Sequence, residues 1–557
     1  MSDAKQEDDL YRQSAEFRDP PVGFWPTVRF LGPGLVLVGS IVGSGELILT
    51  TKLGAQAGFV MLWFVIASCI VKVVVQAELV RHIISSGETI LEVLNKLPGP
   101  SCLRPGWFTM GWLIAFSIAT FAAITAYLYY SDASVSGRCI AGLAAATLVG
   151  CIVYMVSTLR GGGRSPESSA SLKHSGELPR INWFMILFIP AQLAMFVNTG
   201  GIIGGAGQAL EMAFGSAPAE VWAVVVAIIS YILLMSGGYR SLEGISVALV
   251  ATFTLITLIC TVLLQWTPFQ ISWSDLSSGM TFGLPDPLPP IVVLTILSVY
   301  AATGIGHWEM FSYTYWCIEK GYARHAGKRD ESEAWVRRAR GWVRVMYIDS
   351  VLTMFIYTLS TICFYLLGAA ILNRKGIDPS GYTTLSDLES IYIESLGSAA
   401  SVLFISGAFF VLFSTVISAA ASGSRIIADA FCVLGFLPRD DFSARKRVIQ
   451  ISVVASLVLF GYTFFLFKDP PFMLMMTSMI AVFSYPSLGI GAIYLRHKCV
   501  DQRIQPGAIV TVMLWVSGVL LGVASPVMAA ETAAVRRRWK FSSLSSMTPS
   551  TASCASG

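Results

Sequence analysis

Charged residues are scarce in this sequence. Asp, Glu, Lys and Arg together make up 13% of its 557 residues, which is roughly half the share of a typical soluble domain. Polar stretches long enough to form a soluble domain are also lacking, because apolar runs near the spanning length of ~20 residues recur along almost the whole chain. The mean hydropathy is +0.66. The composition therefore predicts an all-α polytopic membrane protein.

Further absences narrow the possible functions. The ten cysteines include no C-x-x-C pair, which argues against a disulfide framework or a zinc site. The first 25 residues have no apolar core of the kind found in a cleaved signal peptide. The glycine run 200–207 lies inside an apolar run, where it favours close helix packing rather than phosphate binding. With no catalytic motif, we expect no enzyme activity, no cofactor, no nucleic acid and no obligatory protein partner; the lipid bilayer is the expected surrounding.

Thirteen apolar runs predict membrane spans. They lie near 32–51, 57–80, 108–129, 138–158, 183–213, 219–237, 243–266, 290–317, 345–372, 398–421, 449–467, 472–495 and 507–529. The polar segment 1–31 is expected to form an N-terminal tail, and 32–529 a single transmembrane domain. The remainder, 530–557, is of low complexity and predicts a disordered C-terminal tail.

The distribution of basic residues predicts the orientation. Loop 267–289 contains no Lys or Arg, whereas loops 159–182, 318–344 and 422–448 each contain several. Because cytoplasmic loops carry an excess of Lys and Arg, we expect the basic loops and the N-terminus to be cytoplasmic. The basic residues at 536–538 then fall on the opposite side, against this rule.

Two of the predicted spans are interrupted by glycines and carry polar residues. The first contains Gly43-Ser44-Gly45 followed by Glu46, and the second contains Gly304-Ile305-Gly306 followed by His307. Gly-interrupted membrane helices in corresponding positions of two halves indicate the substrate site of a transporter. We therefore expect a two-fold repeat whose breaks bring Glu46 and His307 to one central cavity.

The polar residues at these breaks have functional and structural interpretations. Glu46 could bind a cation or carry a proton, together with backbone carbonyls of Gly43, Ser44 and Gly304, or it could bond only to amides freed by the break. His307 could bind a metal or shuttle protons, or simply pack. Glu309 should face away from His307 if the helix has resumed, which favours a salt bridge over a second-tier role at the site.

Lys72 is a cation within the second apolar run. It could pair structurally, with Glu78 nearby, or it could compensate Glu46. In the second case it would oppose metal binding and favour another class of substrate.

Several short motifs together resemble the Nramp family of divalent-metal transporters. They are Gly32-Pro33-Gly34, GAQAG at 54–58, Arg240-Ser241-Leu242-Glu243, Tyr347-Ile348-Asp349-Ser350 and Ser414-Thr415. The resemblance implies a LeuT-like five-plus-five inverted repeat with broken first and sixth core helices. Because the family has no counterpart of the spans 108–129 and 138–158, it also implies that 108–158 is an inserted helical hairpin outside the ten-helix core.

The site motifs differ from those of the family. The family's first-helix motif Asp-Pro-Gly-Asn corresponds to Gly-Ser-Gly-Glu at 43–46, so its aspartate is absent here. Its sixth-helix motif Met-Pro-His corresponds to Ile-Gly-His at 305–307, so the thioether of the methionine is absent and the histidine is kept. The third-helix acid corresponds to Ile202 and the tenth-helix Gln to Ser484, a second-tier candidate. Loss of a soft sulfur ligand favours a harder ion, as in the magnesium-transporting relatives of the family.

We therefore expect a secondary transporter that moves divalent cations by alternating access, with weak proton coupling because 183–210 contains no acid. One alternative is a transporter of a small organic solute on the same fold. Another is a non-transporting sensor that uses the basic loop 318–344 as a docking surface.

Overall fold

The computed structural model describes residues 17–43, 45–109, 111–112, 179–236, 239–397, 400–439 and 441–523. Ser44, both predicted tails beyond these limits and nearly all of the predicted hairpin 108–158 lie outside the described residues. The predicted domain limits and the span count of thirteen therefore stay predictions.

The described chain is almost entirely helical. Its α-helices are α2 (Phe24–Val28), α3 (Pro33–Ile41), α4 (Thr51–Ala57), α5 (Leu62–Ser86), α6 (Ile90–Leu94), α10 (Trp183–Phe214), α11 (Ala219–Ser236), α12 (Tyr239–Leu263), α13 (Trp273–Ser278), α14 (Pro290–Ala302), α15 (His307–Glu319), α16 (Tyr322–Ala326), α17 (Glu333–Leu367), α18 (Thr384–Leu396), α19 (Ala400–Val433), α20 (Phe442–Phe467), α21 (Pro470–Val482) and α22 (Tyr485–Tyr494). Three π-helical turns, η1 (Gly45–Thr50), η3 (Gly368–Asn373) and η5 (Leu495–Cys499), extend helices, and η2 (Leu264–Trp266), η4 (Gly381–Thr383) and η6 (Gln502–Ile504) are 3₁₀ turns. Two short antiparallel strands, β1 (Ser101–Leu103) and β2 (Arg180–Asn182), complete the described elements.

Among the described residues, seven helices are long and apolar enough to cross a membrane. Two bent pairs pass the same test, α3 with η1 and α4, and α21 with α22, and shorter apolar helices lie at Ala251–Trp266 and Ala508–Val523. The structure thus places a helix or a broken helix at each predicted span outside 108–158.

Some predicted loops are wrong, because helices continue into them. α17 begins at Glu333, inside the predicted loop 318–344, and α19 runs to Val433, inside the predicted loop 422–448. Ser332 caps the extension of α17 by accepting a hydrogen bond from the backbone N–H of Trp335 at 3.1 Å. The Trp335 side chain is buried against Val500 and Ile504. Hydropathy predicts only the part of a helix that contacts lipid. Contacts with other parts of the protein stabilise the helix beyond that part.

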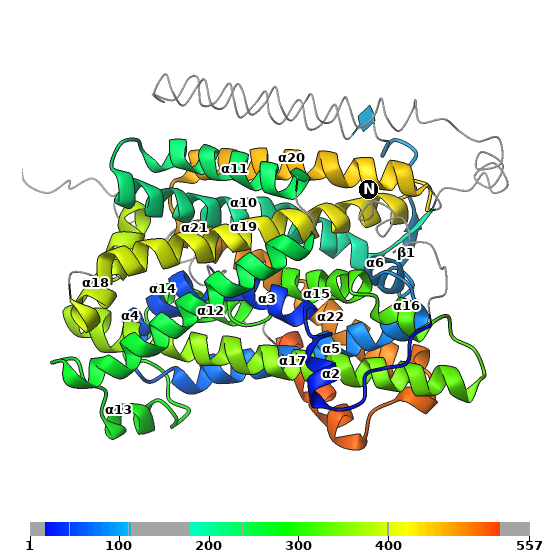
Figure 1. The fold of residues 1–557 in the computed structure, drawn as a ribbon, viewed down its shortest axis with the longest axis horizontal. Coiled ribbons are helices and arrows are strands. Elements are labelled where there is room, and N and C mark those ends of the chain that lie inside the picture. Colours follow the sequence, from blue (N-terminus) through cyan, green and yellow to red (C-terminus); the bar gives the residue numbers. More distant parts are fainter. Residues whose placement is uncertain are drawn as a thin grey trace, which may run out of the picture.

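The helices form two groups with the broken helices between them (Figure 1). α10, α11, α19 and α20 pack on one another in the upper half of the view, and α5 and α17 pack together in the lower half. α3, α14 and α15 lie between these layers, at the centre of the fold.

The two glycine breaks contact each other directly. A Cβ atom on Gly45 would lie 2.5 Å from the carbonyl oxygen of Ala302, the last residue of α14. Such an approach is closer than real side chains allow, so only glycine fits at position 45.

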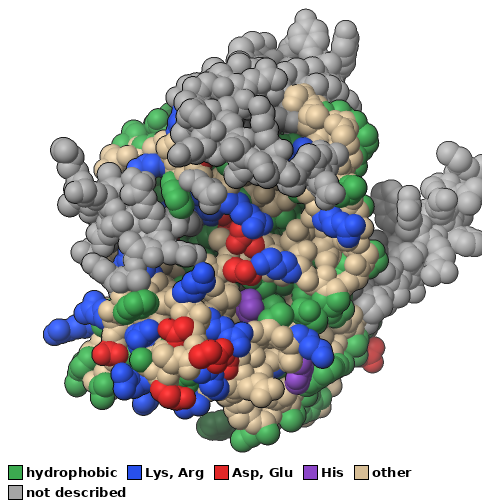
Figure 2. All heavy atoms as spheres, turned by 90° about the vertical axis from the view of Figure 1, so that its right-hand side faces the viewer, with side chains coloured by type: hydrophobic (Ala, Val, Ile, Leu, Met, Phe, Trp, Pro, Cys, Tyr) green, Lys and Arg blue, Asp and Glu red, His purple; other side chains and the backbone are tan. Residues whose placement is uncertain are grey.

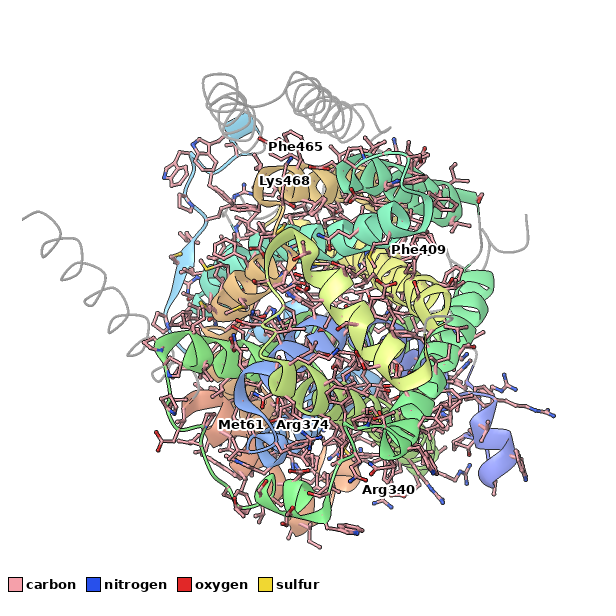
Figure 3. The ribbon with its side chains drawn as sticks, turned by 90° about the vertical axis from the view of Figure 1, so that its left-hand side faces the viewer. Met61, Arg340, Arg374, Phe409, Phe465 and Lys468 are labelled. Atoms are coloured by element: carbon pink, nitrogen blue, oxygen red, sulfur yellow. The ribbon has the colours of Figure 1, made fainter. Side chains whose placement is uncertain are left out.

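At the end of the molecule that faces the viewer in Figure 3, polar contacts join α4 and the turn after it to α17 and to the segment after η3. Lys52 Nζ lies 2.6 Å from Asp378 Oδ1 and also donates to the carbonyl of Pro379. The backbone N–H of the labelled Met61 donates to the hydroxyl oxygen of Tyr365 at 3.0 Å, and the labelled Arg374 pairs with Asp275. This end contains the predicted loop 267–289.

The opposite end carries a dense mixture of basic and acidic side chains, which face the viewer in Figure 2. Asp501 pairs there with Arg329 and Arg503, and Arg503 also approaches Glu331. α16, which belongs to the predicted loop 318–344, lies at this end in Figure 1.

Helix packing beside the first break generates a test. A Cβ on Gly368 would lie 2.3 Å from the carbonyl oxygen of Thr51, and backbone cannot move aside as a side chain can. We expect Gly368→Ala to destabilise the protein by about 1–3 kcal/mol, the usual cost of overpacking.

The matched control is Gly461→Ala on α20, where an added Cβ meets no atom within 4 Å. This change should be neutral or slightly stabilising, because alanine is the better helix former. Thermal unfolding of both purified variants in one detergent measures the difference. Equal unfolding temperatures would contradict the close packing of α4 on η3.

Candidate functional site

A small cavity of about 40 Å³ lies where the broken helices meet the α10–α19 group. One side is formed by α3 and the two breaks, and the other by α10, α19 and α21. The lining residues are Ser40, Ile41, Gly45, Asn198, Ile202, Ala301, Ala302, Gly306, His307, Trp308, Glu309, Thr415, Leu474, Ser478 and Ala481. At ~10–15 Å³ for each water centre, the cavity has room for a few water molecules or a partly hydrated ion.

His307 lines this cavity from the first turn of α15. Its ring is buried and packs against Trp308 and Phe311, with centroid distances of 4.7 and 5.0 Å. Neither ring nitrogen has a hydrogen-bond partner among the described residues. A buried imidazole with both nitrogens unpaired is unusual for a packing histidine, and it leaves a lone pair available to a ligand.

Glu309 lines the same cavity, so the expectation that it faces away from His307 is wrong. The cavity lies at the end of α15 rather than along its side, and residues around the whole first turn reach it. Ser40 Oγ lies 3.4 Å from Glu309 Oε1. The expected salt bridge of Glu309 does not occur among the described residues.

Glu46 does not line the cavity. Its Oε1 accepts a 2.7 Å hydrogen bond from the backbone N–H of Gly304, in the other break, and its Oε2 has no partner among the described residues. This geometry corresponds to the structural interpretation of Glu46, a carboxylate bonded to an amide freed by a helix break. The amide belongs to the second break rather than to its own.

Lys72 approaches the second break from α5. Its fully buried ammonium donates to the carbonyl of Tyr300 at 2.6 Å and to that of Thr303 at 2.5 Å. It therefore caps the C-terminal end of α14, where a cation is favoured by the helix dipole. The expected pairing with Glu78 is wrong, because Glu78 pairs with Arg81 at 3.3 Å.

Lys72 and Glu46 hold opposite sides of a single peptide group. Thr303 contributes the carbonyl that Lys72 binds, and Gly304 contributes the N–H that Glu46 binds. We call these two contacts the Thr303–Gly304 clamp. Gly304 has φ +61, and a Cβ there would lie 3.0 Å from Tyr357, so the clamped peptide requires glycine.

The other predicted residues have varied positions. Gly43 packs so closely on α19 that a Cβ would lie 2.1 Å from Thr415 Oγ1, and its carbonyl already accepts the N–H of Leu47 at 3.0 Å. Ile202 lines the cavity as an apolar side chain, whereas Ser484 lies outside the lining and donates to the carbonyl of Ala481.

Sequence reasoning missed the polar residues that other helices bring to the cavity. Asn198, Thr415 and Ser478 line it from α10, α19 and α21. Asn198 Nδ2 donates to Thr477 at 2.8 Å, which leaves its carbonyl oxygen available. The sequence carries no clear signal for Asn198, since the same apolar run also contains the amides Gln192 and Gln208.

The side chains that line the cavity restrict which metal ions it could bind. Among the described residues, no group of three or more His, Cys, Asp or Glu side chains is placed to hold a metal ion. The cavity has one carboxylate, Glu309, and one imidazole, His307, with amide and hydroxyl groups around them. Oxygen-rich surroundings with few strong ligands suit a hard cation that keeps part of its hydration.

The clamp predicts a stability effect for Lys72→Met. The variant leaves the buried carbonyl of Thr303 without its donor, while that of Tyr300 keeps only the Ser68 hydroxyl at 3.3 Å, so we expect a loss of about 2 kcal/mol. Glu46→Gln should cost less, because its amide oxygen can still accept from Gly304. Thermal unfolding in detergent measures both changes.

Lys96→Met is the control, because Lys96 is 58% exposed and pairs with Glu88 on the surface; its effect should stay within about 1 kcal/mol. The double variant Lys72→Met/Glu46→Gln should deviate from additivity, since both residues act on one peptide. Additive effects would contradict the clamp.

Comparison with known proteins agrees with this architecture. The sequence model of the Nramp family, described as natural resistance-associated macrophage protein-like, matches residues 177–530. A mutant of the Eremococcus coleocola manganese transporter has a TM-score of 0.53 at 12% identity, covering 93% of this chain and 90% of that chain. The same transporter in complex with an aromatic bis-isothiourea substituted compound gives 0.52 at 14% identity, with the same coverage. No curated protein matches the sequence.

The solved structures, at these identities, show the fold alone. They confirm the predicted LeuT-like five-plus-five inverted repeat, with α3–η1–α4 and α14–α15 as its broken first and sixth core helices. The family match begins at residue 177 and so does not include the first break, whereas the structural likeness extends over 93% of the chain. Because the family match covers more than half of the sequence, the chain belongs to the Nramp family of multi-pass membrane transporters.

Proposed function

We propose that the protein is a secondary transporter that moves a divalent metal cation across the membrane by alternating access. The observation that carries this proposal is the polar cavity at the meeting point of the two broken helices, with Glu309 and His307 in its wall. Membership of the Nramp family and the manganese transported by a protein of the same fold support a metal substrate.

In this proposal Glu309 supplies the charge that holds the cation. A divalent ion at bilayer depth needs a compensating negative group, and Glu309 is the acid that lines the cavity among the described residues. His307 supplies a neutral nitrogen, and Asn198, Thr415 and Ser478 supply oxygens. Glu46 acts through Gly304: it fixes the break that presents His307 and Glu309 to the substrate.

The closed ends of the molecule support alternating access. On one side Lys52 pairs with Asp378. On the other, Arg425 pairs with Glu319 at the end of α15, while Asp349 Oδ2 accepts the backbone N–H of Gly34 at 2.7 Å at the start of α3. We propose that these contacts open in turn, and that the end with Arg425 and the N-terminus faces the cytoplasm.

Proton coupling in this proposal is weak. Ile202 occupies the cavity wall from α10, and an aliphatic side chain cannot exchange a proton with the substrate site. Intravesicular pH recorded during uptake tests this point, and stoichiometric acidification would contradict it.

The first functional prediction compares two carboxylates. Glu309→Gln should lower the affinity for Mg²⁺ and Mn²⁺ by roughly 100-fold, an order of magnitude for each ~1.4 kcal/mol of lost attraction. Glu46→Gln preserves the acceptor for Gly304 and should change affinity only a few-fold. Isothermal titration of the purified variants and uptake into proteoliposomes measure both.

The opposite ranking, with Glu46→Gln inactive and Glu309→Gln active, would make Glu46 the cation ligand. Amino acids in the same uptake panel test the alternative of a small organic substrate. If amino acids but no cations are taken up, the metal proposal fails.

The second functional prediction concerns metal preference. Removing the imidazole with His307→Ala should weaken Mn²⁺ binding more than Mg²⁺ binding, because nitrogen ligands favour transition metals. Competition between the two ions for uptake by parent and variant proteoliposomes gives the ratio. An unchanged ratio would mean that His307 does not touch the ion.

A further inference from the structure

A second buried polar cluster lies away from the cavity, between α5 and the turn η5 that follows α22 (Figure 1). It contains Glu78 and Arg81 on α5 and Arg496 on η5. These side chains are almost fully enclosed, with residue exposures of 1%, 0% and 4%. We call these three residues the arginine cluster; none of them lines the central cavity.

The arginine cluster carries one more positive than negative charge. Its acid is Glu78, whose Oε2 lies 3.3 Å from Arg81 Nη1. Arg496 forms no ion pair among the described residues. Two nearby acids are already engaged with other cations: Glu88 pairs with Lys96, and Asp501 pairs with Arg503.

Hydrogen-bond donors also exceed acceptors in the arginine cluster. Arg496 Nη2 donates to the carbonyl of Pro506 and to Thr511 Oγ1, both at 2.8 Å, but its Nε and Nη1 have no partner among the described residues. Arg81 Nε and Nη2 also have none. The Arg81 guanidinium lies 5.1 Å from the ring centroid of Tyr347, whose hydroxyl is likewise unpaired.

Such an arrangement is costly unless something negative completes it. A buried charge without a partner destabilises a fold strongly, and a guanidinium presents N–H groups in a fixed plane that suits an anion. The excess of one charge and the full burial of Arg81 restrict the occupant to a small monovalent anion.

We propose that the arginine cluster is a binding site for a small inorganic anion of the chloride class, held by Arg81, Arg496 and the hydroxyl of Tyr347. This site is independent of the proposed cation site, since a cation would be repelled by the excess positive charge. A bound anion stabilises the contact of α5, the second core helix, with η5, which follows α22 at the end of the tenth core helix.

The test is thermal unfolding of the purified full-length protein at constant ionic strength, with chloride replaced stepwise by gluconate, which is too large to enter. The unfolding temperature should rise with chloride and saturate, as expected for a ligand that binds only the folded state. Bromide should replace chloride, whereas inorganic phosphate should not. A temperature that does not depend on the anion overturns the proposal and leaves water as the occupant.

Variants separate a specific site from a general salt effect. Arg496→Met should abolish the response to chloride, whereas Glu78→Gln, which removes the negative charge of the cluster, should shift saturation to lower chloride by tenfold or more. Arg374→Met is the control, since Arg374 pairs with Asp275 at the opposite end of the molecule, and it should keep the parental response. The same response in all the variants would overturn the proposal. If Arg496→Met does not fold, the Glu78→Gln shift alone decides.

Discussion

The structure depends above all on a single peptide group, the Thr303–Gly304 clamp. A broken membrane helix exposes carbonyls at one end and N–H groups at the other, where no water is present to satisfy them. Here Lys72 satisfies the carbonyl and Glu46 the N–H of that peptide. Two charges that would each be costly at this depth are thus placed at the two poles of one dipole. The break can persist because its polar groups have charged partners from two other helices.

The sequence predicted the helices and the breaks well, because both depend on local properties. Apolar runs mark the spans, and paired glycines mark the interruptions at 43–45 and 304–306. The partners were not predictable in the same way. Glu46 bonds to a residue 258 positions away, and no periodicity reports such a distance. The extension of α17 was missed because its contacts are with protein rather than lipid. Glu309 was assigned to the wrong face because helix periodicity describes the side of a helix, whereas the cavity lies at its end.

The candidate site residues differ in how many hydrogen bonds they already make to the protein. Ser484 and the carbonyl of Gly43 already make protein hydrogen bonds. The imidazole of His307 makes none among the described residues, and the Glu309 side chain makes a long contact of 3.4 Å to Ser40. The uncommitted groups are those that a substrate can engage without first breaking a strong interaction. For this reason we propose that Glu309 and His307 contact the substrate, while Glu46 and Lys72 stabilise the helix break beside them.

The contact between the two breaks also has a mechanical consequence. Glu46 belongs to the first repeat and Gly304 to the second, and Gly45 lies against Ala302 with no side chain between them. Neither broken helix can tilt alone without separating a charged hydrogen bond in a dry environment. The two broken helices should therefore move as one rigid body against α10, α19 and α21. The interface along which these helices move is then the far wall of the cavity, where Thr415, Asn198 and Ser478 lie.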